Sequence, residues 1–74
     1  MPDIIYFRSS TEWTNWLNDH HDKVQEQWVG FFKKKSDKTG ITYSEALDAA
    51  LCFGWIDGIR KRVDDDRYTI RFSP

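Results

Sequence analysis

The sequence has little of what marks several common classes of protein. Its 74 residues include one cysteine, so an intramolecular disulfide is excluded and a reducing compartment suits the chain. No apolar run approaches the roughly 20 residues that span a bilayer. The first residues also lack the basic start and long apolar stretch of a signal peptide. We therefore expect a cytoplasmic protein without a membrane span.

The chain also lacks an excess of charge of one sign. Its 12 acidic and 11 basic residues leave a formal charge of −1, so the chain as a whole has no electrostatic reason to bind nucleic acid. Any basic site must be local. The length fits one small domain, residues 1–74, with a thin core to which four tryptophans contribute.

Motifs that carry enzyme chemistry are missing from the sequence. Cys52 with His20 or His21 resembles a thiolate and its base, but Cys52 follows Leu51 at an apolar helix end, so we interpret it as a small core residue. These residues lack the spacing of a zinc site, and the acidic run at residues 64–66 lacks the glycine and glutamate of a calcium loop. We expect a non-enzymatic protein without metal or cofactor.

Residues 42–58 predict a capped helix that ends in an aromatic turn. Thr42 and Glu45 have the spacing of a capping box, and Gly54 stands where a left-handed residue ends a helix. An Asp-Gly pair then predicts a turn at residues 57–58. The apolar residues repeat with the helical period and predict a core-facing stripe made of Tyr43, Ala46, Leu47, Ala50 and Leu51.

The residues before this helix predict a strand, a helix and a second strand. Residues 4–7 are β-branched and aromatic, which favours a short buried strand. Ser9 or Ser10 caps a helix whose apolar face is Trp13, Trp16, Leu17, His20 and Val24, and a polar run ends it. Residues 27–33 predict a central strand, in which Gly30 marks either a bulge or a place where a tryptophan ring lies on the backbone. Residues 36–40 predict a polar turn.

Beyond residue 58 the alternation of period two predicts a β-hairpin. Placing Val63 opposite Tyr68 puts the apolar residues on one face of the hairpin. In this register Arg60 lies opposite Arg71, and the same face also carries Arg62 and Arg67. The expected fold is α+β: a small, mostly antiparallel sheet with two helices on one face, in the order strand, helix, strand, helix, hairpin.

Three features of the C-terminal half are candidates for binding. The first is the face that carries Arg60, Arg62, Arg67 and Arg71, because guanidinium groups in a fixed array bind phosphate or carboxylate oxygens; the alternative is an ordinary solvated sheet face. The second is Asp57, for which an Asx-turn is the alternative. The third is Trp55, whose ring stands beside a glycine in a turn.

Residues 42–47 (TYSEAL), 51–58 (LCFGWIDG) and 72–74 (FSP) also carry a family resemblance. From about Phe7 onward, the chain resembles the N-terminal part of the YdeI or OmpD-associated (OmdA) family, also called the bacteriocin-protection family. The resemblance implies a binding module linked to envelope stress and to protection against bacteriocins and cationic peptides. It also implies a longer chain that continues past Pro74 and, in some descriptions, a periplasmic location.

These observations lead to two expectations about partners. The first is an unknown protein or anionic ligand, and the alternative is a nucleic acid bound through the arginine face. If the chain is a truncated part of a longer one, we further expect a homodimer through residues 67–72 or the surface around them, because an uncovered sheet edge recruits partners.

Overall fold

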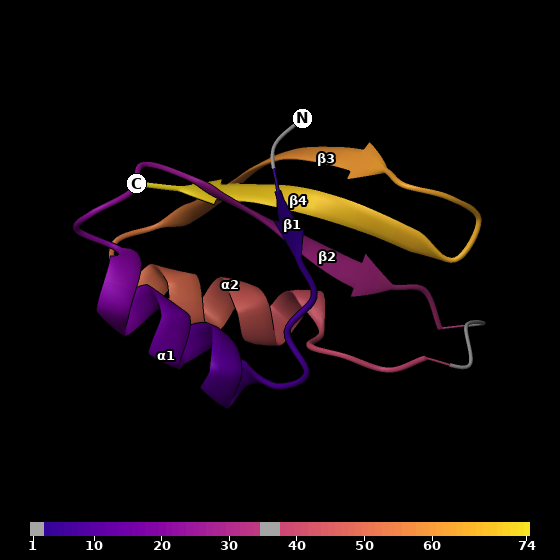
Figure 1. The fold of residues 1–74 in the computed structure, drawn as a ribbon, viewed down its shortest axis with the longest axis horizontal. Coiled ribbons are helices and arrows are strands. Elements are labelled where there is room, and N and C mark those ends of the chain that lie inside the picture. Colours follow the sequence, from indigo (N-terminus) through magenta and orange to yellow (C-terminus); the bar gives the residue numbers. More distant parts are fainter. Residues whose placement is uncertain (1–2, 35–37) are drawn as a thin grey trace.

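The computed structural model describes residues 3–34 and 38–74, which form one sheet with two helices on one of its faces (Figure 1). The elements are β1 (Ile4–Ile5), α1 (Ser10–His20), β2 (Gln27–Phe32), α2 (Tyr43–Cys52), β3 (Ile56–Arg62) and β4 (Arg67–Ser73). The strand order is β1-β2-β4-β3.

The strand pairings make this sheet mixed. β1 is parallel to β2, whereas β2 with β4 and β3 with β4 are antiparallel. The predicted α+β class and element order are therefore confirmed. The predicted polar turn at residues 36–40 lies partly outside the described residues. In the described ranges, 3–34 and 38–74, neither helix has the length and apolar character needed to cross a membrane.

Of the two serines that the sequence offered as the cap of α1, the structure selects Ser9. The Ser9 hydroxyl accepts a hydrogen bond from the backbone N–H of Glu12, and the Glu12 carboxylate accepts one from the backbone N–H of Arg8 at 2.8 Å. The helix ends at His20, as the polar run predicted. The assignment of Val24 to its apolar face is wrong, because the chain has left the helix by then and the Val24 side chain is exposed.

α2 begins at a complete capping box, as predicted. The Glu45 carboxylate accepts from the backbone N–H of Thr42 at 3.0 Å, and the Thr42 hydroxyl accepts from the backbone N–H of Glu45 at 3.2 Å. Each group satisfies a donor that the first helical turn leaves without a partner. The start of α2 is therefore fixed by two residues that lie only three positions apart in the sequence.

The C-terminal end of α2 is a Schellman motif. Gly54 has a φ of 75°, which a residue without a Cβ adopts readily, so the predicted left-handed position is confirmed. The backbone N–H of Trp55 donates to the carbonyl of Ala50 at 2.9 Å, and that of Gly54 donates to the carbonyl of Leu51 at 3.1 Å. This turn reverses the chain and leads it directly into β3.

The core lies between the helices and the sheet and is organised around Trp13. Its ring lies 5.0 Å from that of Phe7 and 5.5 Å from that of Phe72, and its indole N–H donates to the carbonyl oxygen of Ala46 at 2.9 Å. The ring is thus packed against other rings, and its single N–H donor has a hydrogen-bond partner although it is buried away from water. The other buried members of this core are Leu17, Val29, Phe31, Ile41, Ala50, Trp55 and Ile70.

The predicted core stripe of α2 is only partly buried. Ala46 and Ala50 are fully buried and Leu47 is half-buried, but Tyr43 and Leu51 are exposed. The two alanines let α2 approach α1 closely, and this contact turns the larger side chains of the stripe outward. Periodicity located the stripe correctly, but it could not indicate which edge of the stripe meets the core.

Gly30 lies in a regular part of the sheet. It pairs with Thr69 in an uninterrupted register between β2 and β4, so it marks no bulge. The ring that covers it belongs to Tyr6, not to a tryptophan: an added Cβ would lie 2.2 Å from Tyr6 Cε2. That ring also packs on Phe32, at 5.2 Å between centroids. Glycine is required here because the ring occupies the space of a side chain.

β4 is an interior strand of the sheet, with β2 on one side and β3 on the other. The expected contact through residues 67–72 therefore offers no free edge for a second copy. The long edge strand is β3, and the opposite edge strand, β1, has only two residues.

We predict that Thr42→Ala lowers the free energy of unfolding by about 1 kcal/mol, because it removes the cap of α2. Chemical denaturation measures the change. Thr39→Ala is the matched control, since Thr39 is exposed and lies outside both helices. Equal midpoints for the two variants would contradict the role of Thr42.

We also predict that Gly30→Ala lowers the free energy of unfolding by about 1–3 kcal/mol, because the new methyl group displaces the Tyr6 ring. The same substitution in a Tyr6→Ala background should cost much less. Denaturation of the four proteins in this double-mutant cycle tests the contact, and an unchanged cost in the second background would refute it.

Candidate functional site

The hairpin register determines which arginines share a face of the sheet. Asp57 pairs with Phe72 and Arg60 with Ile70, so β3 advances by three residues where β4 advances by two. The extra residue is a β-bulge opposite Arg71. The predicted register is wrong on both sides of the bulge, because Arg62 rather than Val63 lies opposite Tyr68, and Asp57 rather than Ile59 lies opposite Phe72. The first displacement of one residue arises at the hairpin turn, and the bulge adds a second.

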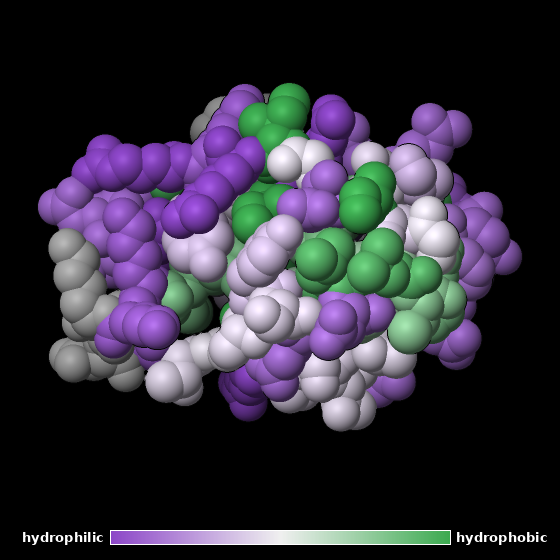
Figure 2. Space-filling view, turned by 180° about the vertical axis from the view of Figure 1, so that it is seen from behind, coloured by the Kyte–Doolittle hydropathy of each residue, from purple (hydrophilic) through white to green (hydrophobic). Residues whose placement is uncertain are grey.

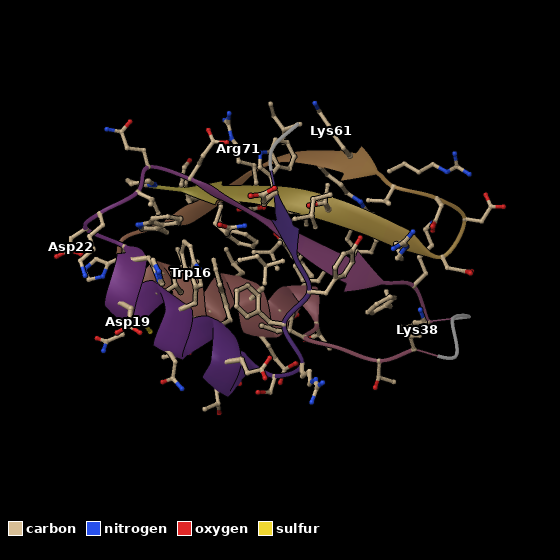
Figure 3. The ribbon with its side chains drawn as sticks, in the orientation of Figure 1. Trp16, Asp19, Asp22, Lys38, Lys61 and Arg71 are labelled. Atoms are coloured by element: carbon tan, nitrogen blue, oxygen red, sulfur yellow. The ribbon has the colours of Figure 1, made fainter. Side chains whose placement is uncertain are left out.

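The observed register at the turn side of the hairpin divides the predicted four-arginine face in two. Arg60 and Arg62 pair with residues whose side chains face the helices, so both point to the helix side of the sheet. Arg67 and Arg71 alternate with those residues along β4 and point to the open side. Figure 3 shows Arg71, together with Lys61, extending away from the helices.

On the open side the cations lie against other groups of the chain. Arg67 Nε donates to Asp64 Oδ2 at 2.9 Å, and its guanidinium lies 5.7 Å from the centre of the Tyr6 ring. This hydrogen bond, with a second from the backbone N–H of Asp66, lowers the pKa of Asp64 to about 2. Arg71 Nε is buried and has no hydrogen-bond partner among the described residues.

On the helix side, Arg60 and Arg62 differ in their partners. Arg62 forms an ion pair with Asp65 at the hairpin turn. The Arg60 guanidinium instead lies over the ring of Tyr68, with Cζ 4.1 Å from the ring centre. Within the described part of the chain, Arg60 forms no ion pair. Phe31 stacks on the same Tyr68 ring at 5.2 Å between centroids, so the position of the ring is held from β2.

Asp57 lies in the same pocket as Arg60. The pair Asp57-Gly58 belongs to β3, so the predicted turn at these residues, and the Asx-turn with it, is wrong. The carboxylate accepts a hydrogen bond from the Tyr43 hydroxyl at 2.7 Å. This bond raises the pKa of Tyr43 above 10.0, with burial and the charge of Asp57 acting in the same direction.

These groups line a pocket of about 380 Å³ between α2 and the hairpin. A neighbouring pocket of about 340 Å³ shares Tyr43 and Tyr68 with it and adds three lysines, Lys33, Lys34 and Lys38. We define the Arg60 pocket by its polar and aromatic lining residues, Tyr43, Asp57, Arg60 and Tyr68. It combines one oriented guanidinium, one carboxylate and two phenol groups.

Of the six residues that the sequence analysis singled out, the structure brings together only Asp57 and Arg60. Trp55 is buried and its ring meets that of Trp16 edge-on at 6.0 Å, so its predicted exposure to a ligand is wrong. Sequence reasoning missed Tyr43 and Tyr68 because both fit an apolar pattern. Their hydroxyl groups were the signal that distinguishes them from core residues.

Cys52 lies in other surroundings than predicted, whereas His20 stacks on Trp16 on the predicted face of α1. Cys52 is exposed, so its assignment to the core is wrong. His20 Nδ1 lies 2.9 Å from the carbonyl oxygen of Trp16, and His21 Nδ1 lies 2.8 Å from that of Leu17. A carbonyl oxygen only accepts, so both Nδ1 atoms donate and help to close the end of α1.

Metal ligands do not gather in the described part of the chain. No group of three or more His, Cys, Asp or Glu side chains there could hold a metal ion. The run at residues 64–66 instead serves the hairpin turn, where Asp64 and Asp65 hold the side chains of Arg67 and Arg62.

Comparisons with known proteins give one match. A family model described as a domain of unknown function (DUF8412) matches residues 5–74. No curated protein and no solved structure matches the chain.

We predict that Asp57→Ala lowers the pKa of Tyr43 toward 10.0, because the substitution removes both the hydrogen-bond acceptor and the negative charge. NMR titration of isotope-labelled tyrosine ring carbons resolves this phenol from the others. Asp48→Ala is the matched control, since Asp48 is an exposed carboxylate on α2.

The sign of the linked stability follows from the direction of the pKa shift. The Tyr43 pKa is higher in the folded chain than in the unfolded chain, so the hydrogen bond stabilises fully below pH 10.0 and its contribution is lost as the pH rises through the folded value. In Asp57→Ala this loss should become smaller, because only burial and the charge of Tyr68 still raise the Tyr43 pKa. An unchanged Tyr43 titration in that variant would show that the hydrogen bond does not form in solution.

Proposed function

The chain belongs to the DUF8412 family, and we propose that it is a non-enzymatic binding module that holds an acidic group of a partner protein in the Arg60 pocket. The observation that carries this proposal is the state of the Arg60 side chain. Its guanidinium is held over the Tyr68 ring at 4.1 Å, and among the described residues it has no acidic partner.

A guanidinium held in this way is suited to a carboxylate. Stacking on an aromatic ring orients the planar group and reduces the side-chain entropy lost when a ligand binds. Its N–H donors then form two parallel hydrogen bonds with one carboxylate. Arg62 and Arg67 are less available, because each already forms an ion pair, Arg62 with Asp65 and Arg67 with Asp64.

The other polar group of the pocket narrows the class of ligand. Asp57 places a carboxylate in the same pocket, and this charge opposes a doubly charged phosphate more than a single carboxylate. The Asp57 carboxylate also accepts hydrogen bonds, which peptide N–H groups supply. A protein segment offers both an acidic side chain and these donors. The three lysines of the neighbouring pocket add to the local attraction.

The wider biological role rests on the family resemblance alone. The YdeI-type resemblance predicts that such binding serves envelope stress and protection against bacteriocins or cationic peptides. That role, and the cytoplasmic location expected from the sequence, stay predictions.

Nucleic-acid binding is the second candidate, and the cations of the open side favour it. Lys61, Arg67 and Arg71 share this face of the sheet. However, Trp28 is only 7% exposed and the Lys61 ammonium lies 5.3 Å from its ring centre, so this ring is not free to stack on a base. Binding through these cations would weaken steeply with added salt.

We predict that Arg60→Gln weakens binding of a short glutamate-rich peptide on the order of tenfold, which matches the loss of a charge-assisted hydrogen bond. Arg62→Gln is the matched control, because Arg62 lies on the same strand and the same side but already pairs with Asp65. Isothermal titration calorimetry measures both affinities. Equal losses of affinity in the two variants would show that binding depends only on the net positive charge of the strand. That result would overturn the Arg60 pocket as the binding site.

A further inference from the structure

Within residues 3–34 and 38–74, β3 is an edge strand without a neighbouring strand on its outer side. It extends over Ile56–Arg62, and β4 is its only partner in the sheet among the described residues. A strand of this kind presents a row of backbone N–H and C=O groups that can pair with another chain. Its seven residues exceed the average length of a strand in a sheet, so the edge is long enough to be a template.

Exposed apolar side chains are concentrated on both sides of this edge. Ile56 and Ile59 of β3 are 48% and 50% exposed, while Tyr43 and Leu51 of α2 are 38% and 52% exposed. Within the described residues, Val24 is the one other large hydrophobic side chain that is exposed. Figure 2, which views the side of α2 and β3, shows hydrophobic residues gathered in the middle of this face.

The packing of α2 explains why this surface is uncovered. Ala46 and Ala50 face the core, so the side of the helix that carries Tyr43 and Leu51 is exposed, and the Tyr43 hydroxyl reaches Asp57 of β3. An additional strand beside β3 would lie next to this side of the helix. Because side chains of a strand alternate between its faces, such a strand would contact Leu51 on the helix side and Ile59 on the open side.

The charge of β3 indicates which occupant fits. Its second half is the basic run Arg60-Lys61-Arg62, in which all three side chains are exposed. A second copy of the chain would bring the same cations on its own β3, and like charges placed opposite one another destabilise such a pairing. An acidic segment complements the run.

We propose that an extended acidic segment of a partner protein adds to β3 as a further strand of the sheet. The inference deepens the proposed function: it rests on that function for the acidic group at Arg60, and it adds the binding mode. Backbone hydrogen bonds to β3 supply the affinity, and side chains on the two faces supply the specificity.

The order of residues along β3 defines the segment further. Apolar side chains of the partner would lie beside Ile56 and Ile59, and acidic side chains beside Arg60 and Lys61, because Arg62 already pairs with Asp65. The partner segment is therefore acidic in one half and apolar in the other. Its length is about that of an ordinary strand, roughly five to seven residues.

The first part of the test is a selection. A displayed library of random linear peptides of about ten residues, long enough to form one strand, is enriched on the immobilised whole chain. The expected peptides carry an acidic half and an apolar half rich in β-branched residues. Binding should slow amide hydrogen exchange in β3 by more than about tenfold, with nuclear Overhauser contacts from the peptide to the methyl groups of Leu51 and Ile59.

The second part separates backbone pairing from charge. N-methylation at alternate peptide amides keeps the side chains but removes donors, and it should weaken binding at least about tenfold when it falls on the paired amides. Ile59→Thr and Leu51→Gln should also weaken binding. Val24→Thr is the matched control, because Val24 is exposed at 36% and lies on neither β3 nor α2.

The outcomes distinguish this inference from the proposed function. If Arg60→Gln weakens binding of the peptide but N-methylation at either set of amides does not, the Arg60 pocket stands and strand addition is overturned. If N-methylation and Ile59→Thr weaken it but Arg60→Gln does not, strand addition stands and the Arg60 pocket is overturned. Strand addition by a partner is overturned if the selection enriches no peptide. It is also overturned if the β3 amides are protected from exchange only when the chain associates with itself.

Discussion

The fold depends on one buried contact, the hydrogen bond from the Trp13 indole to the carbonyl of Ala46. It joins α1 to α2 beneath the sheet, at residues 33 positions apart, while the Trp13 ring packs on Phe7 and Phe72. In a chain of this length few other contacts could replace it, since small domains bury a limited apolar area. An indole N–H buried without its acceptor would also cost free energy.

The same contact determines the functional surface. Because α2 meets Trp13 through its alanines, Tyr43 and Leu51 turn outward beside β3. Tyr43 then reaches Asp57, and this hydrogen bond ties the start of α2 to the start of β3. The Arg60 pocket and the uncovered edge are thus both consequences of how closely the two helices approach.

Local features of the fold were predictable because their causes lie within a few residues. The Thr42–Glu45 capping box and the Gly54 turn depend on hydrogen bonds across three to five positions, so their spacing is visible in the sequence. The hairpin was also predictable from its alternation. Its register was not, because alternation reveals neither that Arg62 lies opposite Tyr68 nor that a bulge lies between Asp57 and Arg60. Gly58 lies in this bulge, where an added Cβ would lie 3.3 Å from the carbonyl oxygen of Arg71.

The sequence by itself therefore determined the class of fold, the element order and the presence of Asp57 and Arg60 as candidates. Tertiary structure alone decided that these two share a pocket with Tyr43 and Tyr68, while Arg67 and Arg71 lie on the other face. It likewise decided that Trp55 is buried and Cys52 exposed. The physical reason is that periodicity indicates which residues of one element share a face, whereas contacts between distant residues fix the register between strands and what each face meets.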